Sequence, residues 1–152
     1  MSQEQELLVR KAMGAVNDGD IETIVAMIGP ETEYELVGGF ADLADQPVLK
    51  GPEDVRRFFM DWFETFKTTH VEPTNFVEAG DRLLVLAYYE VTTKESNTPV
   101  RLYMGQIYSF DGAAISRVAS YHDRDAAIEA ARLSGAEAAE LRPRTSAPPG
   151  PG

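Results

Sequence analysis

Residues 82–93 read Arg-Leu-Leu-Val-Leu-Ala-Tyr-Tyr-Glu-Val-Thr-Thr, and residues 100–110 read Val-Arg-Leu-Tyr-Met-Gly-Gln-Ile-Tyr-Ser-Phe. Stretches rich in β-branched and aromatic residues with a period of two predict β-strands. If one face of such a strand were exposed to water, every second residue would be polar, but here the odd-numbered and the even-numbered positions both carry apolar residues. The two stretches therefore predict strands of a sheet whose two faces are both at least partly covered.

Turn signals extend this pair into a larger sheet. Gly80-Asp81, the segment 95–99 and Asp111-Gly112 separate candidate strands over 70–78, 82–93, 100–110 and 114–122. Connections this short demand antiparallel neighbours. A short alternating segment, Glu33–Val37, predicts one more strand, and Gly105 in mid-strand suits a bend or a bulge that helps the sheet curl.

The remaining segments predict four helices. Apolar residues one, three and four positions apart indicate a helix over 5–16, and Gly19 and Asp20 can end it and cap a second helix over 21–28. A third helix opens at Gly51-Pro52 and carries an aromatic face made of Phe58, Phe59, Trp62, Phe63 and Phe66. Asp123 can cap a last short helix that docks shallowly, and the aperiodic segment 38–50 predicts a long loop that acts as a lid.

Composition limits the classes of partner. The chain has 152 residues, no cysteine, and 14 basic against 25 acidic side chains, a formal charge of −11. The missing cysteines exclude a disulfide scaffold, a thiolate zinc site and a cysteine nucleophile. The negative charge disfavours nucleic acid and anionic membranes, and no apolar run reaches about 18 residues. We therefore expect one cytoplasmic domain over 4–133, followed by an Ala-rich turn and a disordered Pro/Gly-rich tail over 134–152.

Gln106 is the informative polar residue of the strands. If its face is the interior one, the amide must find partners, because an unpaired buried amide costs about 1–3 kcal/mol. Tyr88, Tyr108 and Tyr121 on neighbouring strands can supply hydroxyls. Phenols and an amide grouped in an apolar wall suit a ligand site, and they suit equally a polar cluster that satisfies itself without a ligand.

Residues able to do acid-base chemistry are few. His70 and His122 lie on different strands without metal-ligand spacing, and no glycine motif of a nucleotide site is present, so we expect no metal and no cofactor. Imidazole is the side chain best suited to proton transfer near neutral pH, and His122 lies at the end of the last strand. A histidine at that place is also compatible with a purely structural role.

Three groups of residues together resemble a known family. They are the helix pair joined by Asn17-Asp18-Gly19-Asp20, the segment Gly51-Pro52-Glu53-Asp54-Val55-Arg56-Arg57-Phe58-Phe59, and the ending Tyr121-His122-Asp123-Arg124-Asp125. The chain is similar in these to the SnoaL-like branch of the nuclear transport factor 2-like superfamily. The resemblance implies an α+β fold, a cone-shaped α+β barrel. In it a curved antiparallel sheet wraps around the third, long helix and encloses an apolar cavity, with two N-terminal helices, a short C-terminal helix and commonly a homodimer formed through the sheet.

The resemblance does not imply a single activity. Members include polyketide cyclases, ketosteroid isomerases, epoxide hydrolases and domains that only bind, so function depends on the site. Of the isomerase residues, the oxyanion tyrosine falls on Ala12, the general-base aspartate on Leu36 and the protonated aspartate on Gln106. For a cyclase-like proton transfer the resemblance leaves His122, Tyr121 and Tyr88 as candidates.

Our leading hypothesis is a cofactor-free cavity protein that acts on or binds a hydrophobic, oxygenated small molecule. Gln106 with Tyr88 and Tyr121 would hold its oxygen, and His122 would move a proton next to a carbonyl if the protein is a lyase or isomerase. The expected cavity wall comprises Tyr34, Phe58, Trp62, Leu86 and Met104. The alternatives are a non-catalytic binding or sequestration module and a dimeric interaction domain.

Overall fold

The computed structural model describes residues 3–38, 46–112 and 114–133, which form one curved sheet and its covering helices. The helices are α1 (Gln3–Asp18), α2 (Ile21–Ala26), α3 (Gly51–Thr65) and α4 (Arg124–Ala131). The strands are β1 (Glu33–Val37), β2 (Val48–Lys50), β3 (Phe66–Ala79), β4 (Arg82–Thr93), β5 (Val100–Asp111) and β6 (Ala114–Tyr121). The predicted α+β class is confirmed. No helix in these ranges is long and apolar enough to cross a membrane.

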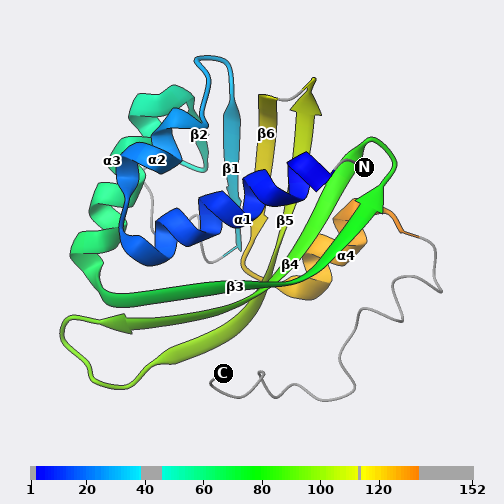
Figure 1. The fold of residues 1–152 in the computed structure, drawn as a ribbon. Coiled ribbons are helices and arrows are strands. Elements are labelled where there is room, and N and C mark those ends of the chain that lie inside the picture. The colour runs from blue at the N-terminus through cyan, green and yellow to red at the C-terminus, as the bar shows by residue number, and fades with distance from the viewer. Residues whose placement is uncertain (1–2, 39–45, 113, 134–152) are drawn as a thin grey trace.

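The sheet has the order β2-β1-β6-β5-β4-β3 and is curved without closing on itself (Figure 1). The strands from β3 to β6 pair antiparallel in chain order, as the short turns predicted. β1 joins them beside β6 as a parallel strand, with Tyr34 opposite Val118. This pairing could not be predicted, because a five-residue strand carries no information about a partner so distant along the chain.

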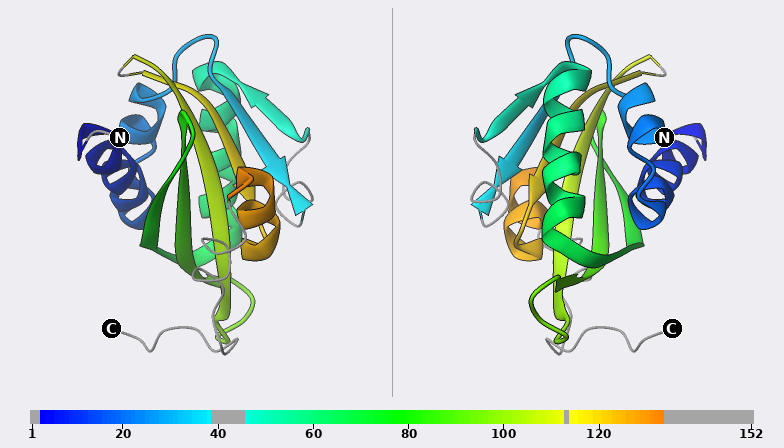
Figure 2. Two further views of the ribbon diagram at one scale, coloured as in Figure 1. Left: turned by 90° about the vertical axis from the view of Figure 1, so that its right-hand side faces the viewer. Right: turned by 90° about the vertical axis from the view of Figure 1, so that its left-hand side faces the viewer.

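Both faces of the sheet are covered, as the apolar strands predicted. Helices α1, α2 and α3 share one core with the first face, and α4 packs on the opposite face (Figure 2). The expected shallow docking of the last helix is wrong, because Ala127, Ile128 and Ala131 of α4 are at most 3% exposed. The homodimer through the sheet stays a prediction.

The predicted helix caps are present. Gly19 has a φ of 68°, and the Asp20 carboxylate accepts a hydrogen bond from the backbone N–H of Thr23 at 3.2 Å. The Asp123 carboxylate accepts one from the N–H of Asp125 at 3.0 Å. The predicted loop over 38–50 is wrong in its last part, because Val48–Lys50 pairs antiparallel with β1. The rest of the proposed lid, 39–45, and the tail 134–152 lie outside the described residues.

A side chain of α1 occupies the free edge of β3. The amide of Asn17 donates a hydrogen bond to the carbonyl of Val71 at 2.9 Å, and its oxygen accepts one from the N–H of Val71 at 2.7 Å. β3 is the last strand of the sheet, and both backbone groups of Val71 bind a residue outside it, so they point away from β4. Asn17 therefore makes the bonds that a further strand would make at this position.

Gly105 is required by the close approach of α4 and not by a bulge. The β4–β5 ladder continues unshifted through Gly105, and the β5–β6 ladder begins there. A Cβ built on Gly105 would overlap the Cβ of Ala127 and lie 3.3 Å from Cδ2 of Leu86. The expected bulge at this residue is therefore wrong: the glycine allows α4 to approach the sheet closely.

Replacing Gly105 by alanine should destabilise the fold by about 1–3 kcal/mol, because the new methyl group forces α4 away from the sheet. Urea unfolding of the wild type and the Gly105→Ala variant measures this loss. Gly14→Ala is the matched control: nothing lies within 4 Å of a Cβ at that helical position, and alanine should stabilise α1 by up to about 1 kcal/mol. A Gly105→Ala variant as stable as the wild type would contradict the close packing.

Candidate functional site

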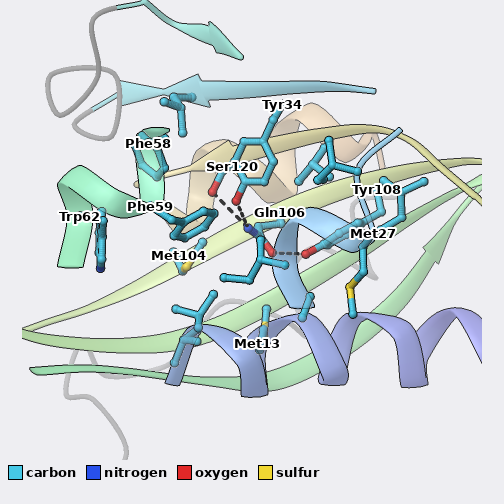
Figure 3. Close-up of a pocket in the computed structure, with 18 of the residues that line it drawn as sticks. Met13, Met27, Tyr34, Phe58, Phe59, Trp62, Met104, Gln106, Tyr108 and Ser120 are labelled. Carbon is cyan, nitrogen blue, oxygen red and sulfur yellow. Dashed lines mark hydrogen bonds between the residues drawn. The ribbon is translucent and has the colours of Figure 1, made fainter. Parts of the chain in front are cut away.

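A cavity lies between the first face of the sheet and helices α1, α2 and α3. Its volume is about 80 Å³, and its wall is mostly aliphatic, aromatic and thioether carbon. Met13 comes from α1, Phe58 and Trp62 from α3, and Met104 from β5 (Figure 3). The indole N–H of Trp62 donates to the hydroxyl of Thr69 at 3.0 Å, so this polar group is satisfied within the protein.

The amide of Gln106 is the centre of a polar cluster in this wall. Gln106 is only 7% exposed. Its Nε2 donates to the Tyr34 hydroxyl at 3.0 Å and to the Ser120 hydroxyl at 3.3 Å, and its Oε1 accepts from the Tyr108 hydroxyl at 2.5 Å (Figure 3). The amide thus finds the partners that burial demands. Strands β1, β5 and β6 each contribute to the cluster, so the sheet fixes its geometry.

The cluster has one more donor hydrogen than it uses. The amide carries two donor hydrogens and the three hydroxyls carry one each. These groups make four contacts, three to the amide and one between Tyr34 and Ser120. Within the described residues these four side chains make no further hydrogen bond. Whichever way the amide and hydroxyls are oriented, at least one donor hydrogen is left without a partner among the described residues.

Burial also controls the charge of the cavity. Desolvation raises the pKa of the Tyr34 phenol, and hydrogen bonds from Ser120 and Gln106 reduce that rise. Desolvation raises the pKa of Tyr89 and of Tyr108 well above the ordinary value, helped by the nearby Tyr34. These phenols are neutral hydrogen-bonding groups at neutral pH. Among the described lining residues none has a carboxylate, imidazole, ammonium or guanidinium group.

Comparison with known proteins identifies the family. The model of the SnoaL-like domain matches residues 9–120, about three quarters of the chain. The chain belongs to the SnoaL-like domain family. No curated protein sequence matches it.

Solved structures agree with this SnoaL-like fold. TerC, co-crystallised with polyporic acid, is 20% identical with a TM-score of 0.70, over 86% of this chain and 100% of TerC. An NTF2-like protein of unknown function from Burkholderia pseudomallei is 20% identical with a TM-score of 0.71, over 89% and 99% of the two chains. A putative SnoaL-like polyketide cyclase from Jannaschia is 14% identical with a TM-score of 0.64, over 80% and 88%. At these identities the likeness establishes the fold alone.

The structure brings together five of the residues predicted for the site of this SnoaL-like domain. Tyr34, Phe58, Trp62, Met104 and Gln106 all line the cavity. So do Ala12 and Leu36, the positions at which the resemblance places the tyrosine and the general-base aspartate of ketosteroid isomerases. Both positions therefore lie at the cavity wall in this protein, and both carry apolar side chains.

Leu86, Tyr88 and Tyr121 lie on the other side of the sheet. Leu86 is opposite Gly105 and Tyr88 opposite Tyr103, whereas Val85 is opposite Gln106. The predicted placement of these residues beside Gln106 is therefore wrong. Even-numbered residues of β4 lie opposite odd-numbered residues of β5, and a shift of one residue exchanges the two faces of a strand. Leu86 and Tyr121 pack in the core beneath α4.

The candidate proton-transfer residues therefore lie outside the cavity lining. The hydroxyl of Tyr88 donates to Glu90 at 2.6 Å, and Glu90 also pairs with Arg101 at 3.2 Å. His122 follows β6 as an exposed residue, and its backbone N–H donates to the carbonyl of Val37 at 3.3 Å. The catalytic roles assigned to His122, Tyr88 and Tyr121 stay predictions.

Two members of the polar cluster were absent from the predicted site. Tyr108 lies two residues after Gln106 in β5, so the alternation of the strand places both side chains on the same face. This signal was available in the sequence, but Tyr108 was predicted only as a partner for the amide. Ser120 is opposite Gln106 across the β5–β6 ladder. Finding Ser120 requires the register of that ladder, in which the pairing shifts between Ser109 and Phe110.

The buried phenols should make the fold sensitive to alkaline pH. Because their folded pKa values are raised, Tyr34, Tyr89 and Tyr108 stabilise the fold fully below the unfolded value of about 10, and this contribution is lost as the pH rises through the folded values. We expect part of the phenolate absorbance to appear only together with loss of the circular dichroism of the fold. Tyr108→Phe should reduce that late part by one phenol. Complete ionisation of all six tyrosines in a protein that keeps its native dichroism would contradict the burial.

Proposed function

We propose that this SnoaL-like domain binds a small, neutral, largely apolar molecule that carries a hydrogen-bond acceptor, such as a ketone. The observation that supports this is the unused donor hydrogen of the cluster formed by Gln106, Tyr34, Tyr108 and Ser120. An apolar wall with a few placed polar groups is the usual construction of a small-molecule site. A carbonyl oxygen accepts hydrogen bonds and donates none, so it complements a cluster with spare donors.

The size of the cavity limits the ligand. A volume of about 80 Å³ is near half of the ~150 Å³ that holds a benzene ring in a rigid apolar cavity. Met13, Met27 and Met104 form part of the wall. Thioether side chains have three rotatable bonds and adapt to irregular shapes. A ligand of about four heavy atoms therefore fits the cavity without rearrangement. A ring is larger, so methionine side chains would have to move to admit it.

We infer binding without turnover as the principal role. Proton transfer next to a carbonyl needs a group that titrates near the working pH, and the described lining offers only phenols with raised pKa values. His122, the predicted proton shuttle, lies outside this lining. The catalytic alternative is a cyclase-like or isomerase-like proton transfer with His122, and it has the support of the putative polyketide cyclase among the structural neighbours.

Acetophenone should bind more tightly than ethylbenzene, which has nearly the same shape without the carbonyl. One neutral hydrogen bond contributes about 0.5–1.5 kcal/mol, so the ketone should be favoured about 2- to 10-fold. Titrations followed by protein NMR measure both dissociation constants, and the shifted resonances should include Gln106 and Ser120. Equal affinities would contradict the role of the spare donor.

Gln106→Glu is the sharpest variant for this test. It keeps the shape of the side chain but removes the spare hydrogen. With an ionised glutamate the cluster has three donor hydrogens, all on hydroxyls, for its four contacts. With a protonated glutamate it has four donor hydrogens for the four contacts, so none is spare. The preference for acetophenone over ethylbenzene should disappear in either protonation state. Met60→Ala, at an exposed residue of α3 outside the lining, should keep the preference and serves as the control.

The same ligand distinguishes the catalytic alternative. Abstraction of a proton next to the acetophenone carbonyl exchanges the methyl protons for deuterium in heavy water. The binding proposal predicts the uncatalysed exchange rate at all ratios of protein to ligand. Faster exchange that is lost in His122→Ala would replace binding without turnover by the proton-transfer function.

A further inference from the structure

A groove on the surface lies directly outside the cavity. It has a volume of about 530 Å³ and runs between Leu8 and Lys11 of α1, Ala26 of α2 and Ala114 of β6. Two residues, Met27 and Ile115, belong both to the wall of the groove and to the wall of the cavity. The two hollows therefore adjoin each other at these two residues.

The two shared side chains differ in their freedom to move. Ile115 is 5% exposed, its backbone carbonyl accepts a hydrogen bond from the Thr32 hydroxyl at 2.9 Å, and its β-branched side chain is stiff. Met27 is the C-cap residue that directly follows α2, is half-buried, and has a flexible side chain. Figure 3 shows Met27 at the end of the cavity opposite Trp62, with the Gln106 cluster between them.

We infer that Met27 is the gate between the cavity and the groove, and that the two hollows form one elongated site when its side chain moves aside. This rests on the proposed function of the inner cavity. The geometry selects a ligand with a small carbonyl-bearing head and a linear apolar chain. The head fits the cavity of about 80 Å³ beside Gln106, and the chain passes Met27 into the groove.

The contacts in the groove fit such a chain. Leu8, Ala26 and the outer side of Met27 offer apolar surface to it. Lys11 and Glu22 give the groove a polar rim that faces water, and Glu22 also pairs with Arg56. The ligand's chain can therefore be apolar where it lies along the groove and polar at the end farthest from the carbonyl.

The test uses the linear ketones 2-pentanone and 2-nonanone, which share one head and differ by four methylenes. Each methylene that enters the groove should raise the affinity about fourfold if fully buried. Met27→Ala should raise the affinity for 2-nonanone about fivefold more than that for 2-pentanone, because the long ketone no longer has to displace the thioether. Dissociation constants come from protein NMR, where 2-nonanone alone should shift the amide resonances of Lys11, Ala26 and Ala114.

Met13→Ala is the matched variant, because Met13 lines the cavity and not the groove. It enlarges the inner hollow and should change the affinities for both ketones by the same factor. Ala26→Phe narrows the groove and should reduce the ratio of the two affinities. Thermal melts establish that each variant is folded.

The outcomes separate the gate from the proposed function. If 2-pentanone binds but chain length has no effect, or if Met27→Ala and Met13→Ala change both ketones alike, the gate is wrong and the binding cavity stands. If neither ketone binds the wild type or any folded variant, the proposed function fails and the gate fails with it.

Discussion

The fold depends on one buried amide that is fully paired. Gln106 lies in the middle of an apolar core, where an unpaired amide would cost about 1–3 kcal/mol, and three hydroxyls from β1, β5 and β6 remove that cost. The pairing also fixes the character of the cavity. Because these donors outnumber the contacts they make, the cavity wall keeps a donor hydrogen, and its described lining carries no charged side chain.

Local signals in the sequence predicted most elements and some of the site. Capping by Asp20 and Asp123, the helix start at Gly51-Pro52 and the turn signals near Gly80 and Gly112 each act within a few residues, and the structure confirms them. The cavity wall contributed by α3 was also predictable, because a helical face has one fixed period. The glutamine was found because an amide among apolar strand residues is conspicuous.

Pairings between distant segments could not be predicted from the sequence. The placement of Leu86 and Tyr88 depends on whether β4 and β5 pair even with odd residues, which the connection 94–99 does not reveal. The parallel pairing of β1 with β6 and the short strand β2 likewise involve few residues and no local signal. The role of Gly105 could not be predicted for the same reason, because the helix that packs against it begins far along the chain and lies on the opposite face of the sheet.

Asn17 has a consequence for how this sheet can associate. The outermost strand of an open sheet is a template on which another chain can continue the ladder, a route to swapped dimers and fibrils. The amide of Asn17 holds both outward backbone groups of Val71, and Pro73 two residues later has no N–H to offer. Growth of the sheet by strand addition is thus interrupted in the middle of β3, so a second copy of this domain would not extend the sheet through a continuous ladder at that edge.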